Sequence, residues 1–503
     1  METQHPIPDI GDMPEADFRR LLHEVADWIA DYRAGLETRR VLPEHAPGAI
    51  IKDLPDAPPD AAVPVEEVLR DFERVIMPGI VHWGHPAFLG YFATTTNAPA
   101  IVGEMLAAAL NVSAMTWQTS PAATELEFVV LDWIRQMLGL PADFRGIVYD
   151  TASVSILHAL AAAREDLGLD VRRDGLAGRG DVPQLTLYAS DQAHSSLEKA
   201  AITLGLGEAN VRRIASDDEY RMDTGALRRA VAADIDAGRR PLAVVATVGT
   251  TSATSVDPVE AIADVCSEHG IWLHVDAAYG GALALLEEGR HVMRGVERAD
   301  SVVFNPHKWL FVPLDFSALY VRRPETLRRV FSLVAEYLRG DAERAGDDIP
   351  NYMDYGIQLG RRFRALKAWF VIRSFGRDGL AARIREHCRL ARLVASWIEA
   401  DERFETLAPV GMSVVCFRAR ATGASAGEGE AQAAATDELN ERLLARINAT
   451  GATYLTHTRL GGRLALRIAV GNVLTTERHL AAVWELIQDQ LSTLSTEAGA
   501  SQT

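Results

Sequence analysis

Short apolar runs alternate with amphipathic stretches across roughly residues 98–365. Runs such as GIVYD, LTLYA, LAVVATVG and IWLHVD have the length and composition of buried strands, and the stretches between them have the apolar spacing of helices. Strands that alternate with helices predict βαβ units and a mostly parallel sheet. We therefore interpret residues 98–365 as one large α/β domain.

The two flanks of this region have different patterns. Residues 1–97 combine helical spacing with proline-rich stretches and contain little apolar material for a core, so we expect a helical segment that packs on the main body or on a second subunit. Residues 366–503 begin with a long helical stretch, with a break expected at Gly376 or Gly379. Two strand-like runs, MSVVCFRAR and LALRIAV, and two further helical stretches then predict a small α+β domain.

Three polar stretches lack a periodic pattern. The low-complexity stretch ATGASAGEGEAQAAAT, residues 421–436, is predicted to be a mobile surface loop, and the tail STEAGASQT, residues 495–503, is predicted to be disordered. The stretch VAEYLRGDAERAGDDIP, residues 334–350, is polar and flanked by more regular patterns. It is interpreted as a lid over a binding site.

Composition excludes several classes of function. The 503 residues are 48% hydrophobic and 24% charged, which is typical of a globular protein and excludes wholesale disorder. The formal net charge of −18 disfavours nucleic-acid binding, since phosphate contacts need a basic face. No apolar run approaches the roughly 18 residues of a membrane span, and the N-terminus has no secretory pattern. The three cysteines match no metal or disulfide spacing, so we expect a cytoplasmic protein without a metal.

Lysine is rare in this chain. Only Lys52, Lys199, Lys308 and Lys367 occur among 51 basic residues, and the rest are arginines. A retained lysine can mark a position where an amine forms a covalent bond that a guanidinium cannot form. The alternative is a bias in codon supply, so the count alone decides nothing.

Polar residues follow several predicted strands, and ligands bind at the carboxyl ends of strands in open α/β sheets. Residues 151–153, Thr-Ala-Ser, precede a helix whose first N–H groups can hold phosphate, although they can also be an ordinary cap. Asp276 ends IWLHVD and is followed by Ala277 and Ala278. Its carboxylate can pair with a protonated ring nitrogen beside small residues, or it can cap the next helix.

Three further strand ends carry candidate groups. Lys308, after His307, lies among apolar residues, where desolvation lowers the pKa of an amine and makes it nucleophilic. His194 precedes a helix, where imidazole can stack on a planar ring or transfer protons. Thr250 and Thr251 can hold a cofactor oxygen or form a turn. Each signal alone is weak, but together the groups describe a site for pyridoxal phosphate (PLP).

The motifs carry a family resemblance that extends over residues 10–490. The matching stretches are HPAFLGYF, TSPAATELE, DQAHSSLEKA, GTTSATSVDP, WLHVDAAYGG, FNPHKWL and LGRRFRALKAWF. The chain thereby resembles the PLP-dependent group II decarboxylases, in particular the aromatic-L-amino-acid decarboxylase branch. The resemblance implies a fold-type I large domain like that of aspartate aminotransferase, with a seven-stranded, mostly parallel sheet. It also implies a homodimer with the active site at the subunit interface.

The resemblance assigns cofactor roles to individual residues. Lys308 corresponds to the lysine that binds PLP covalently, Asp276 to the partner of the pyridine nitrogen, and His194 to the stacking histidine. Ala278 corresponds to the residue beneath the ring, and Thr251 to a threonine near the cofactor. The phosphate and substrate contacts correspond to Ala152, Ser153, Asn305 and His307. These assignments make Lys308, His194 and Asp276 the catalytic group, together with Tyr337 of the lid.

Substrate contacts follow from the same resemblance. They correspond to Trp83, Tyr91, Phe92, Thr94 and His307, and, from the neighbouring subunit, to Ser113 and Met115. The aromatic residues favour a flat ring, so tryptophan, tyrosine, phenylalanine or dihydroxyphenylalanine are the leading substrates. Three departures, Ala93 for a usual proline, Asp150 for a common glycine and the stretch SAMTW, indicate a wider or more polar pocket.

Tyr337 and the other motifs separate the alternatives. Similar enzymes that release an aldehyde carry phenylalanine at the position of Tyr337, so the tyrosine favours simple decarboxylation to an amine. An aldehyde synthase and a decarboxylase of a non-aromatic amino acid remain open. An aminotransferase would not call for His307 before the lysine, and a catalytically silent homologue would not need Lys308, Asp276 and His194.

Overall fold

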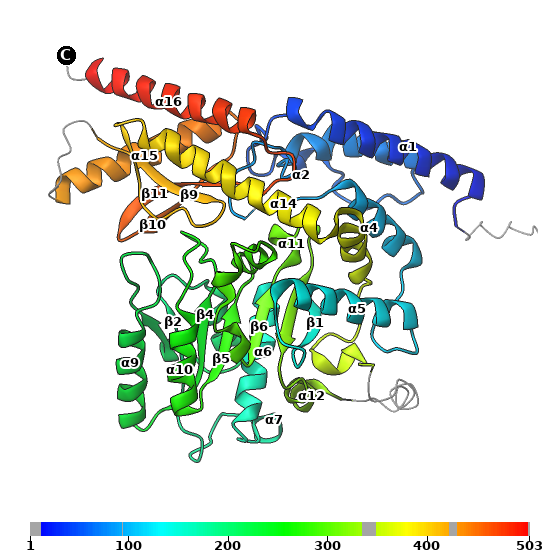
Figure 1. The fold of residues 1–503 in the computed structure, drawn as a ribbon. Helices are drawn as coiled ribbons and strands as arrows, with labels where there is room; N and C mark the ends of the chain where they lie inside the picture. The colour runs from blue at the N-terminus through cyan, green and yellow to red at the C-terminus, as the bar shows by residue number, and fades with distance from the viewer. Residues whose placement is uncertain (1–11, 93, 334–348, 422–429, 501–503) are drawn as a thin grey trace, which may run out of the picture.

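The structure is a computed structural model that describes residues 12–92, 94–333, 349–421 and 430–500. A seven-stranded sheet lies at its centre, in the order β1-β7-β6-β5-β4-β2-β3 (Figure 1). The strands are β1 (Arg145–Tyr149), β2 (Leu185–Ser190), β3 (Val211–Ile214), β4 (Arg240–Thr247), β5 (Trp272–Asp276), β6 (Ser301–Phe304) and β7 (Ser317–Val321). Only β7 runs antiparallel to its neighbours, β1 and β6. The predicted mostly parallel, seven-stranded sheet is confirmed.

Helices cover both faces of this sheet. One face packs against α6 (Ala152–Asp166), α8 (Ser196–Thr203) and α12 (Glu325–Phe331), and the other against α5 (Pro121–Leu138), α9 (Thr224–Asp236), α10 (Val259–His269) and α14 (Ala365–Glu399). Strand β4 shows how the sequence divides between the faces. Ala243 and Val245 join one core, and Val244 and Ala246 join the other, because side chains alternate along a strand. A strand buried on both faces reads as a continuous apolar run, as LAVVATVG does.

A second sheet of four antiparallel strands lies near the C-terminus, in the order β10-β11-β9-β8. Its elements are β8 (Phe404–Thr406), β9 (Val414–Ala419), α15 (Glu430–Ala449), β10 (Thr456–Leu460), β11 (Arg463–Ala469) and α16 (Glu477–Ala500). Residues far away in sequence complete its core: Val41, Phe88 and Leu89 pack among the C-terminal apolar side chains. Phe88 also forms a parallel bridge with Tyr454. The proposed domain boundaries at residues 97 and 365 stay a prediction.

Two stretches that were predicted to lack regular structure are partly helical, so these two predictions are wrong in part. Residues 430–436 of the predicted loop form the start of α15, where the run Ala433–Ala435 has high helix propensity and the Thr436 hydroxyl donates to the Gln432 carbonyl. The predicted disordered tail continues α16 through Ala500. Leu494 is buried just before it, and the Arg446 guanidinium forms an ion pair with Glu497 at 2.9 Å, so tertiary contacts hold the tail.

Glycine produces the predicted break in the long helix α14. Gly376 has φ +64° and ψ 170°, and it interrupts the helical backbone at one of the two expected positions. The helix runs across the top of the sheet and continues alongside the C-terminal elements (Figure 1). It thereby connects the large and small sheets through a single element.

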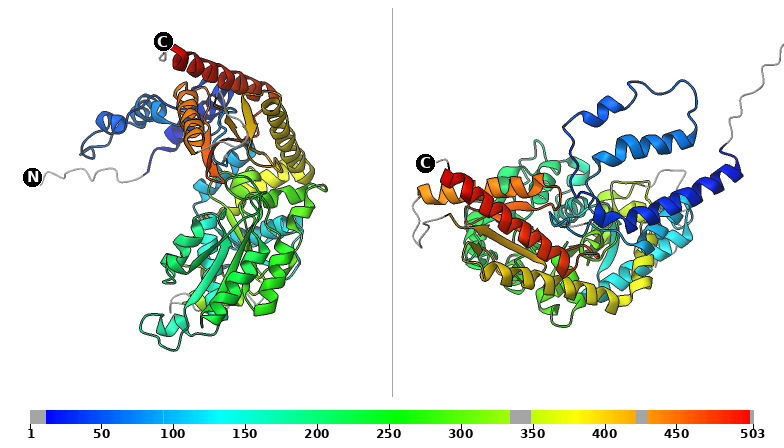
Figure 2. Two further views of the ribbon diagram at one scale, coloured as in Figure 1. Left: turned by 90° about the vertical axis from the view of Figure 1, so that its left-hand side faces the viewer. Right: turned by 90° about the horizontal axis from the view of Figure 1, so that it is seen from above.

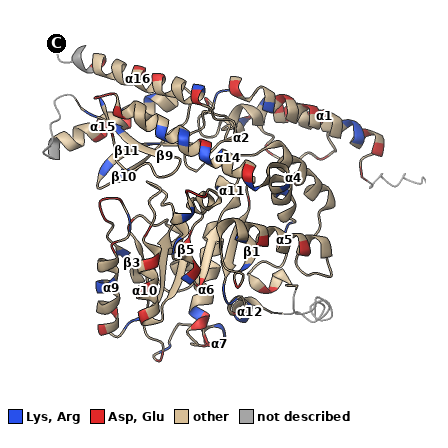
Figure 3. Ribbon diagram, in the orientation of Figure 1, with Lys and Arg blue, Asp and Glu red and all other residues tan. Residues whose placement is uncertain are grey.

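The N-terminal helix α1 (Glu15–Ala34) extends along the top of the molecule, away from the large sheet (Figure 2). Leu21 is its one buried residue, while Phe18 and Leu22 are exposed. Acidic and basic residues are interspersed along this helix and along α16 (Figure 3). The segment also contains α2 (Ala49–Asp53) and α3 (Val65–Asp71), and α4 (Ala98–Leu110) follows it. No described helix is both long enough and apolar enough to cross a membrane.

Three of the buried histidines, His158, His274 and His387, have similar surroundings in the folded core. His158 donates from Nδ1 to the Val154 carbonyl at 2.7 Å, His274 pairs with the Ser301 hydroxyl at 2.8 Å, and His387 accepts from the Trp309 indole at 3.1 Å. Burial is the largest cause that lowers the pKa of each, from 6.5 to about 4. All three rings are therefore neutral in the folded protein at neutral pH.

These histidines predict a loss of stability in mild acid. Between pH 6.5 and about 4 the unfolded chain binds protons that the folded chain does not, so each ring lowers the free energy of unfolding by about 1.4 kcal/mol per pH unit as the pH falls. His387→Gln should remove one proton from this dependence, whereas His45→Gln, at an exposed position, should leave it unchanged. Urea unfolding at several pH values measures the slope, and equal slopes for the two variants would contradict the assignment.

Candidate active site

The carboxyl ends of β4, β5 and β6 meet at one edge of the large sheet. Thr247 pairs with Asp276, and Asp276 pairs with Val303, so the three strand ends are in register. Beyond them the Val248 amide donates to the Asp276 carbonyl at 2.8 Å, and the Asn305 amide donates to the Ala278 carbonyl at 3.1 Å. The backbone therefore brings the predicted site residues at the ends of these strands, among them Asp276 and Asn305, to the same edge of the sheet.

Lys308 lies in α11 (Pro306–Trp309), a single turn that follows β6. Its amide donates to the Asn305 carbonyl at 2.9 Å, and its Nζ lies 5.1 Å from the centre of the Phe92 ring. Burial lowers the pKa of this amine, Asp276 opposes the shift, and Arg467 adds to it. A larger fraction of the amine is therefore neutral, which is the form that acts as a nucleophile.

Asp276 is the last residue of β5. Its Oδ1 accepts a hydrogen bond from the Ala278 amide at 3.0 Å, and no Lys or Arg in the described part of the chain forms an ion pair with it. Ala278 is buried, and its methyl side chain leaves room for a flat ring above the backbone. The second carboxylate oxygen can accept from a protonated ring nitrogen.

His194 and His307 both present Nε2 as a hydrogen-bond donor. The Ser196 amide donates to Nδ1 of His194 at 3.1 Å, and the Phe316 amide donates to Nδ1 of His307 at 3.0 Å. Because Nδ1 accepts in each ring, the proton of the neutral imidazole resides on Nε2. Burial is the largest cause that lowers both pKa values, that of His307 to about 3.

The start of α6 offers a place for a phosphate. Thr151 caps the helix, and its carbonyl accepts from Val154 and Ser155, whereas the amides of Ala152 and Ser153 have no acceptor among the described residues. Free N–H groups at the positive end of a helix bind anions. Ser153 is exposed at this end, and its hydroxyl is available to the same ligand.

Asp150, directly before this cup, is neutralised by the protein. Its carboxylate accepts from Arg364 at 2.5 Å and from Gln358 at 2.9 Å, and Arg364 is buried and also contacts Asp315 at 3.0 Å. A carboxylate at this position would otherwise repel a phosphate. The departure from the common glycine is therefore compensated by a cation held between two acids.

Of the remaining residues predicted to contact the cofactor, two are buried and bonded within the protein, and one is exposed. Asn305 is buried, and its Oδ1 accepts from the Ser317 hydroxyl at 2.6 Å, which fixes the side chain and leaves its amide nitrogen to donate. The buried Thr250 hydroxyl accepts from the Ser255 amide at 3.0 Å and so shapes the turn. Thr251 is exposed at the edge of the site.

Aromatic side chains form a wall beside the amine. The Phe92 ring stacks on Tyr279, with centroids 3.8 Å apart, and Tyr279 stacks on Trp309 at 4.7 Å. Trp83 stacks on Tyr91 at 5.6 Å, and both remain partly exposed in the single chain. Phe92 lies beside Lys308, whereas Trp83 and Tyr91 stack on each other without a described contact to this amine. Thr94 is partly buried in the same segment.

Ser113 and Met115 belong to a different part of the chain surface. The Met115 carbonyl accepts from Met353 at 3.0 Å, and the Arg361 amide donates to the Ser113 hydroxyl at 3.4 Å. Neither residue has a described contact with Lys308 or with the aromatic wall. Within one chain the site therefore lacks these two predicted contacts. Tyr337 and Ala93 lie outside the described residues.

Three residues at the site were missed from the sequence. Arg467 is buried, and its guanidinium carbon lies 4.8 Å from the centre of the Phe92 ring. Its Nη1 donates a hydrogen bond to the Tyr91 carbonyl at 2.7 Å, whereas its Nη2 has no partner among the described residues. Tyr454 forms a hydroxyl–hydroxyl hydrogen bond with Tyr91 at 2.9 Å. Tyr279 was available within the motif HVDAAY, but the other two come from the distant C-terminal domain.

The residues present fit PLP. The site offers unpaired N–H groups for a phosphate, a carboxylate for the pyridine nitrogen, a small residue beneath a flat ring and a desolvated amine for the aldehyde. Two neutral imidazoles and the unpartnered Arg467 nitrogen add donors for anionic oxygens. No three His, Cys, Asp or Glu side chains in the described ranges cluster as metal ligands.

Comparisons with known proteins agree with this arrangement. Residues 47–420 match the pyridoxal-dependent decarboxylase conserved domain. Tryptophan decarboxylase 1 of Oryza sativa subsp. japonica is 40% identical over 94% of this chain and 93% of the relative. Phenylacetaldehyde synthase of a Rosa hybrid cultivar is 39% identical over 94% of this chain and 93% of the relative.

A solved structure is similar over nearly the whole chain. The crystal structure of Oryza sativa TDC with PLP and tryptamine has a TM-score of 0.90 and 39% identity, and the match covers 96% of this chain and 99% of that one. This similarity confirms the expected fold-type I architecture. The chain belongs to the group II PLP-dependent amino-acid decarboxylases, in the branch that contains the aromatic-amino-acid decarboxylases.

Proposed function

We propose that this decarboxylase converts an aromatic L-amino acid to the corresponding amine and CO2. The observation that carries the proposal is the amine of the partly buried Lys308, which lies 5.1 Å from an aromatic ring at the same sheet edge as Asp276. An amine whose charged form is disfavoured beside an aromatic wall suits a cofactor aldehyde and a substrate with a flat side chain.

The cofactor and the protein divide the chemistry. When bound, PLP supplies the sink for the electron pair that remains at Cα after CO2 leaves. Asp276 keeps a proton on the ring nitrogen, which strengthens this sink. The N–H groups of Ala152 and Ser153 would hold the phosphate of the cofactor.

Two imidazoles orient the reacting groups. His194 would stack on the ring of the bound cofactor, and its Nε2–H would be available to a substrate carboxylate. His307 donates its Nε2–H from a buried position, beside Asn305. Because both pKa values are lowered, these rings act as neutral donors, and neither must lose a charge before substrate enters. Orientation of the Cα–carboxylate bond across the ring plane decides which bond at Cα breaks.

The aromatic wall supports the choice of substrate. Trp83, Tyr91 and Phe92 offer flat surfaces, and ring stacking favours a substrate ring over an aliphatic chain of similar size. The similarity to a tryptophan decarboxylase and to a TDC structure with tryptamine points the same way.

Exposed apolar residues support a homodimer. On α4 the side chains of Val102, Met105, Leu106 and Leu110 are exposed, and Phe18 and Leu22 are exposed on α1. Such a surface is costly in water unless another chain covers it. We assign Ser113 and Met115 to the substrate pocket of the partner subunit, since they have no described contact with the aromatic wall of their own chain.

Tyr337 is assigned the final proton transfer to Cα. The tyrosine favours an amine product over an aldehyde, even though one of the similar proteins is a phenylacetaldehyde synthase. The lid around it would exclude water while the proton moves.

A substrate panel tests the proposed function. The purified protein with PLP should release CO2 from at least one of tryptophan, tyrosine, phenylalanine and dihydroxyphenylalanine, with the amine identified by mass. Glutamate and histidine should react at least a hundredfold more slowly in kcat/KM. Lys308→Ala should abolish turnover, because it removes the amine proposed to bind the cofactor aldehyde. Preferred turnover of a non-aromatic amino acid would overturn the substrate assignment.

Replacement of Tyr337 by phenylalanine tests the product. Tyr337→Phe removes the proposed proton donor, so the product should shift from amine to aldehyde, with ammonia and hydrogen peroxide released and oxygen consumed. An oxygen electrode and mass analysis of the product measure this shift, and Tyr355→Phe is the matched control. A Tyr337→Phe enzyme that forms only amine at the wild-type rate would contradict the assigned role.

The Tyr91–Tyr454 hydrogen bond predicts an effect on substrate binding. Tyr91 has a left-handed backbone, φ +53°, and a Cβ on Gly90 would lie 2.6 Å from the Tyr454 ring, so only glycine lets the two tyrosines approach. Tyr454→Phe should raise KM for the aromatic substrate about fivefold, since a hydrogen bond contributes about 1 kcal/mol, and should change kcat less than twofold.

The control for this substitution is Tyr188→Phe, which removes a hydroxyl that donates to Asp234 away from the site. Steady-state kinetics should give an unchanged KM for the control. An unchanged KM for Tyr454→Phe would contradict the prediction, because Tyr91 would then keep its position without the hydrogen bond to Tyr454.

A further inference from the structure

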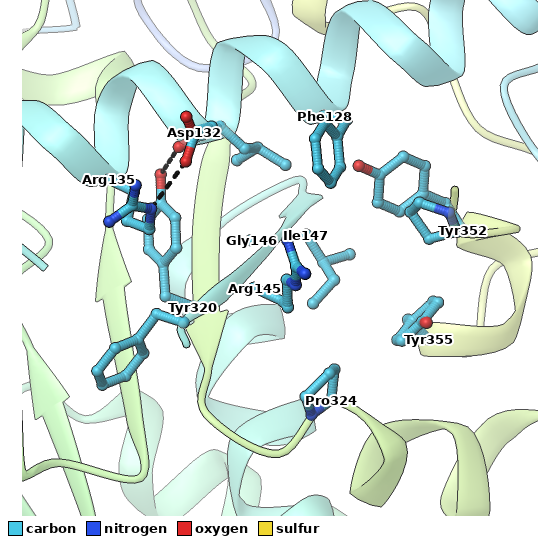
Figure 4. Close-up of a pocket in the computed structure, with 13 residues that line it drawn as sticks. Phe128, Asp132, Arg135, Arg145, Gly146, Ile147, Tyr320, Pro324, Tyr352 and Tyr355 are labelled. Carbon is cyan, nitrogen blue, oxygen red and sulfur yellow. Dashed lines mark hydrogen bonds and ion pairs between the residues drawn. The ribbon is translucent and has the colours of Figure 1, made fainter. Parts of the chain in front are cut away.

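A cavity separate from the proposed active site lies at the beginning of β1, at the opposite end of the strand from the proposed phosphate cup (Figure 4). Its volume is about 170 Å³. It is enclosed by α5, the start of β1, the end of β7 and η9 (Tyr352–Tyr355). None of its lining residues belongs to the site described above. The lining is Phe128, Leu131, Asp132, Arg135, Phe144, Arg145, Gly146, Ile147, Tyr320, Pro324, Pro350, Tyr352 and Tyr355.

The walls of this cavity combine aromatic and aliphatic side chains with a similar share of polar surface. Phe128 projects from α5 toward Tyr352, and Ile147 and Tyr355 complete the lower side in the view of Figure 4. An apolar cavity of about 150 Å³ can hold a benzene-sized molecule. The space therefore suits one aromatic ring.

Most polar groups around the cavity are satisfied by the protein. The Arg135 guanidinium forms an ion pair with Asp132 at 2.8 Å and donates to the Leu140 carbonyl at 2.6 Å. The Tyr320 hydroxyl donates to the Leu131 carbonyl at 2.8 Å. These groups shape the walls and have little remaining capacity for a ligand.

Tyr352 is different, because its hydroxyl has no partner. The side chain is 2% exposed, and its oxygen makes no hydrogen bond within the described part of the chain. Figure 4 shows this hydroxyl directed toward Phe128, across the space between α5 and η9. A buried hydroxyl without a partner destabilises the protein, so a ligand atom that accepts a hydrogen bond from it binds more tightly.

Arg145 supplies an unpaired positive charge beside the same ring. It is the first residue of β1, it is exposed, and no Asp or Glu in the described ranges forms an ion pair with it. Its guanidinium carbon lies 5.8 Å from the centre of the Phe128 ring. The cavity thus combines an aromatic slot, an unused donor and a free cation.

We propose that this cavity binds a small aromatic carboxylate. The ring lies between Phe128 and Tyr352, and the carboxylate accepts from the Tyr352 hydroxyl and faces the Arg145 guanidinium. A charge-assisted hydrogen bond is stronger than a neutral one, so an acid binds better than the amide of the same shape. A cationic amine is disfavoured, because the nearby Asp132 already pairs with Arg135.

The cavity is tied to the loop that carries Ser113 and Met115. The Met353 amide of η9 donates to the Met115 carbonyl at 3.0 Å, and the Trp117 amide donates to the Asn351 side chain at 2.9 Å. The Arg361 guanidinium also lies 4.6 Å from the Tyr352 ring centre. A ligand on Tyr352 therefore contacts the element that holds this loop.

A titration of the holoenzyme with 4-fluorophenylacetate, followed by fluorine NMR, tests the proposal. The probe should bind saturably and at least tenfold more tightly than 4-fluorophenylacetamide. Arg145→Gln and Tyr352→Phe should each weaken binding at least fivefold. Arg240→Gln, at the first and exposed residue of β4, should leave it unchanged, and Lys308→Ala should also retain binding, which separates this cavity from the proposed active site.

Thermal unfolding distinguishes a lost contact from a lost fold. Tyr352→Phe removes a buried hydroxyl without a partner, so its unfolding midpoint without probe should equal or exceed that of the wild type. Absence of saturable binding, equal affinity for acid and amide, or wild-type affinity in both Arg145→Gln and Tyr352→Phe would each overturn the proposal.

Discussion

The partial burial of one amine is the constraint on which the proposed chemistry depends. Lys308 is placed by a single helical turn after β6 and is surrounded by buried apolar residues, so its charged form is disfavoured. The same sheet edge brings Asp276 close enough to oppose this shift partly. The register of three parallel strands sets both positions. Strand pairing therefore places the proposed catalytic residues Asp276 and Lys308 at one edge of the sheet.

Neutralised charges are a recurring feature around this edge. Asp150 is held by Arg364, which also contacts Asp315, and Arg361 is buried against Glu127 at 2.6 Å. A buried charge without a partner is costly, so these pairs allow polar chemistry beside a closely packed core. The site can therefore present an anion-binding helix end with an acidic residue directly before it.

The sequence predicted the parts of the fold that depend on local pattern. Continuous apolar runs identified β4 and β5, and Asp276 could be found because a charged residue ended such a run. Strand β3 was missed, since VRRI is short and contains two arginines at the sheet edge. Arg467 and Tyr454 were missed because tertiary packing alone brings them to the site. The helical tail was missed because its stability comes from Leu494 and from the Arg446–Glu497 ion pair.

Chemical identification of the modified lysine tests the central claim most directly. The holoenzyme is reduced with borohydride, digested and mapped by mass spectrometry, which locates any phosphopyridoxyl group. This account predicts the group on the peptide that contains Lys308, in nearly every chain. A label on Lys52, Lys199 or Lys367, or no label after full reduction, would contradict it.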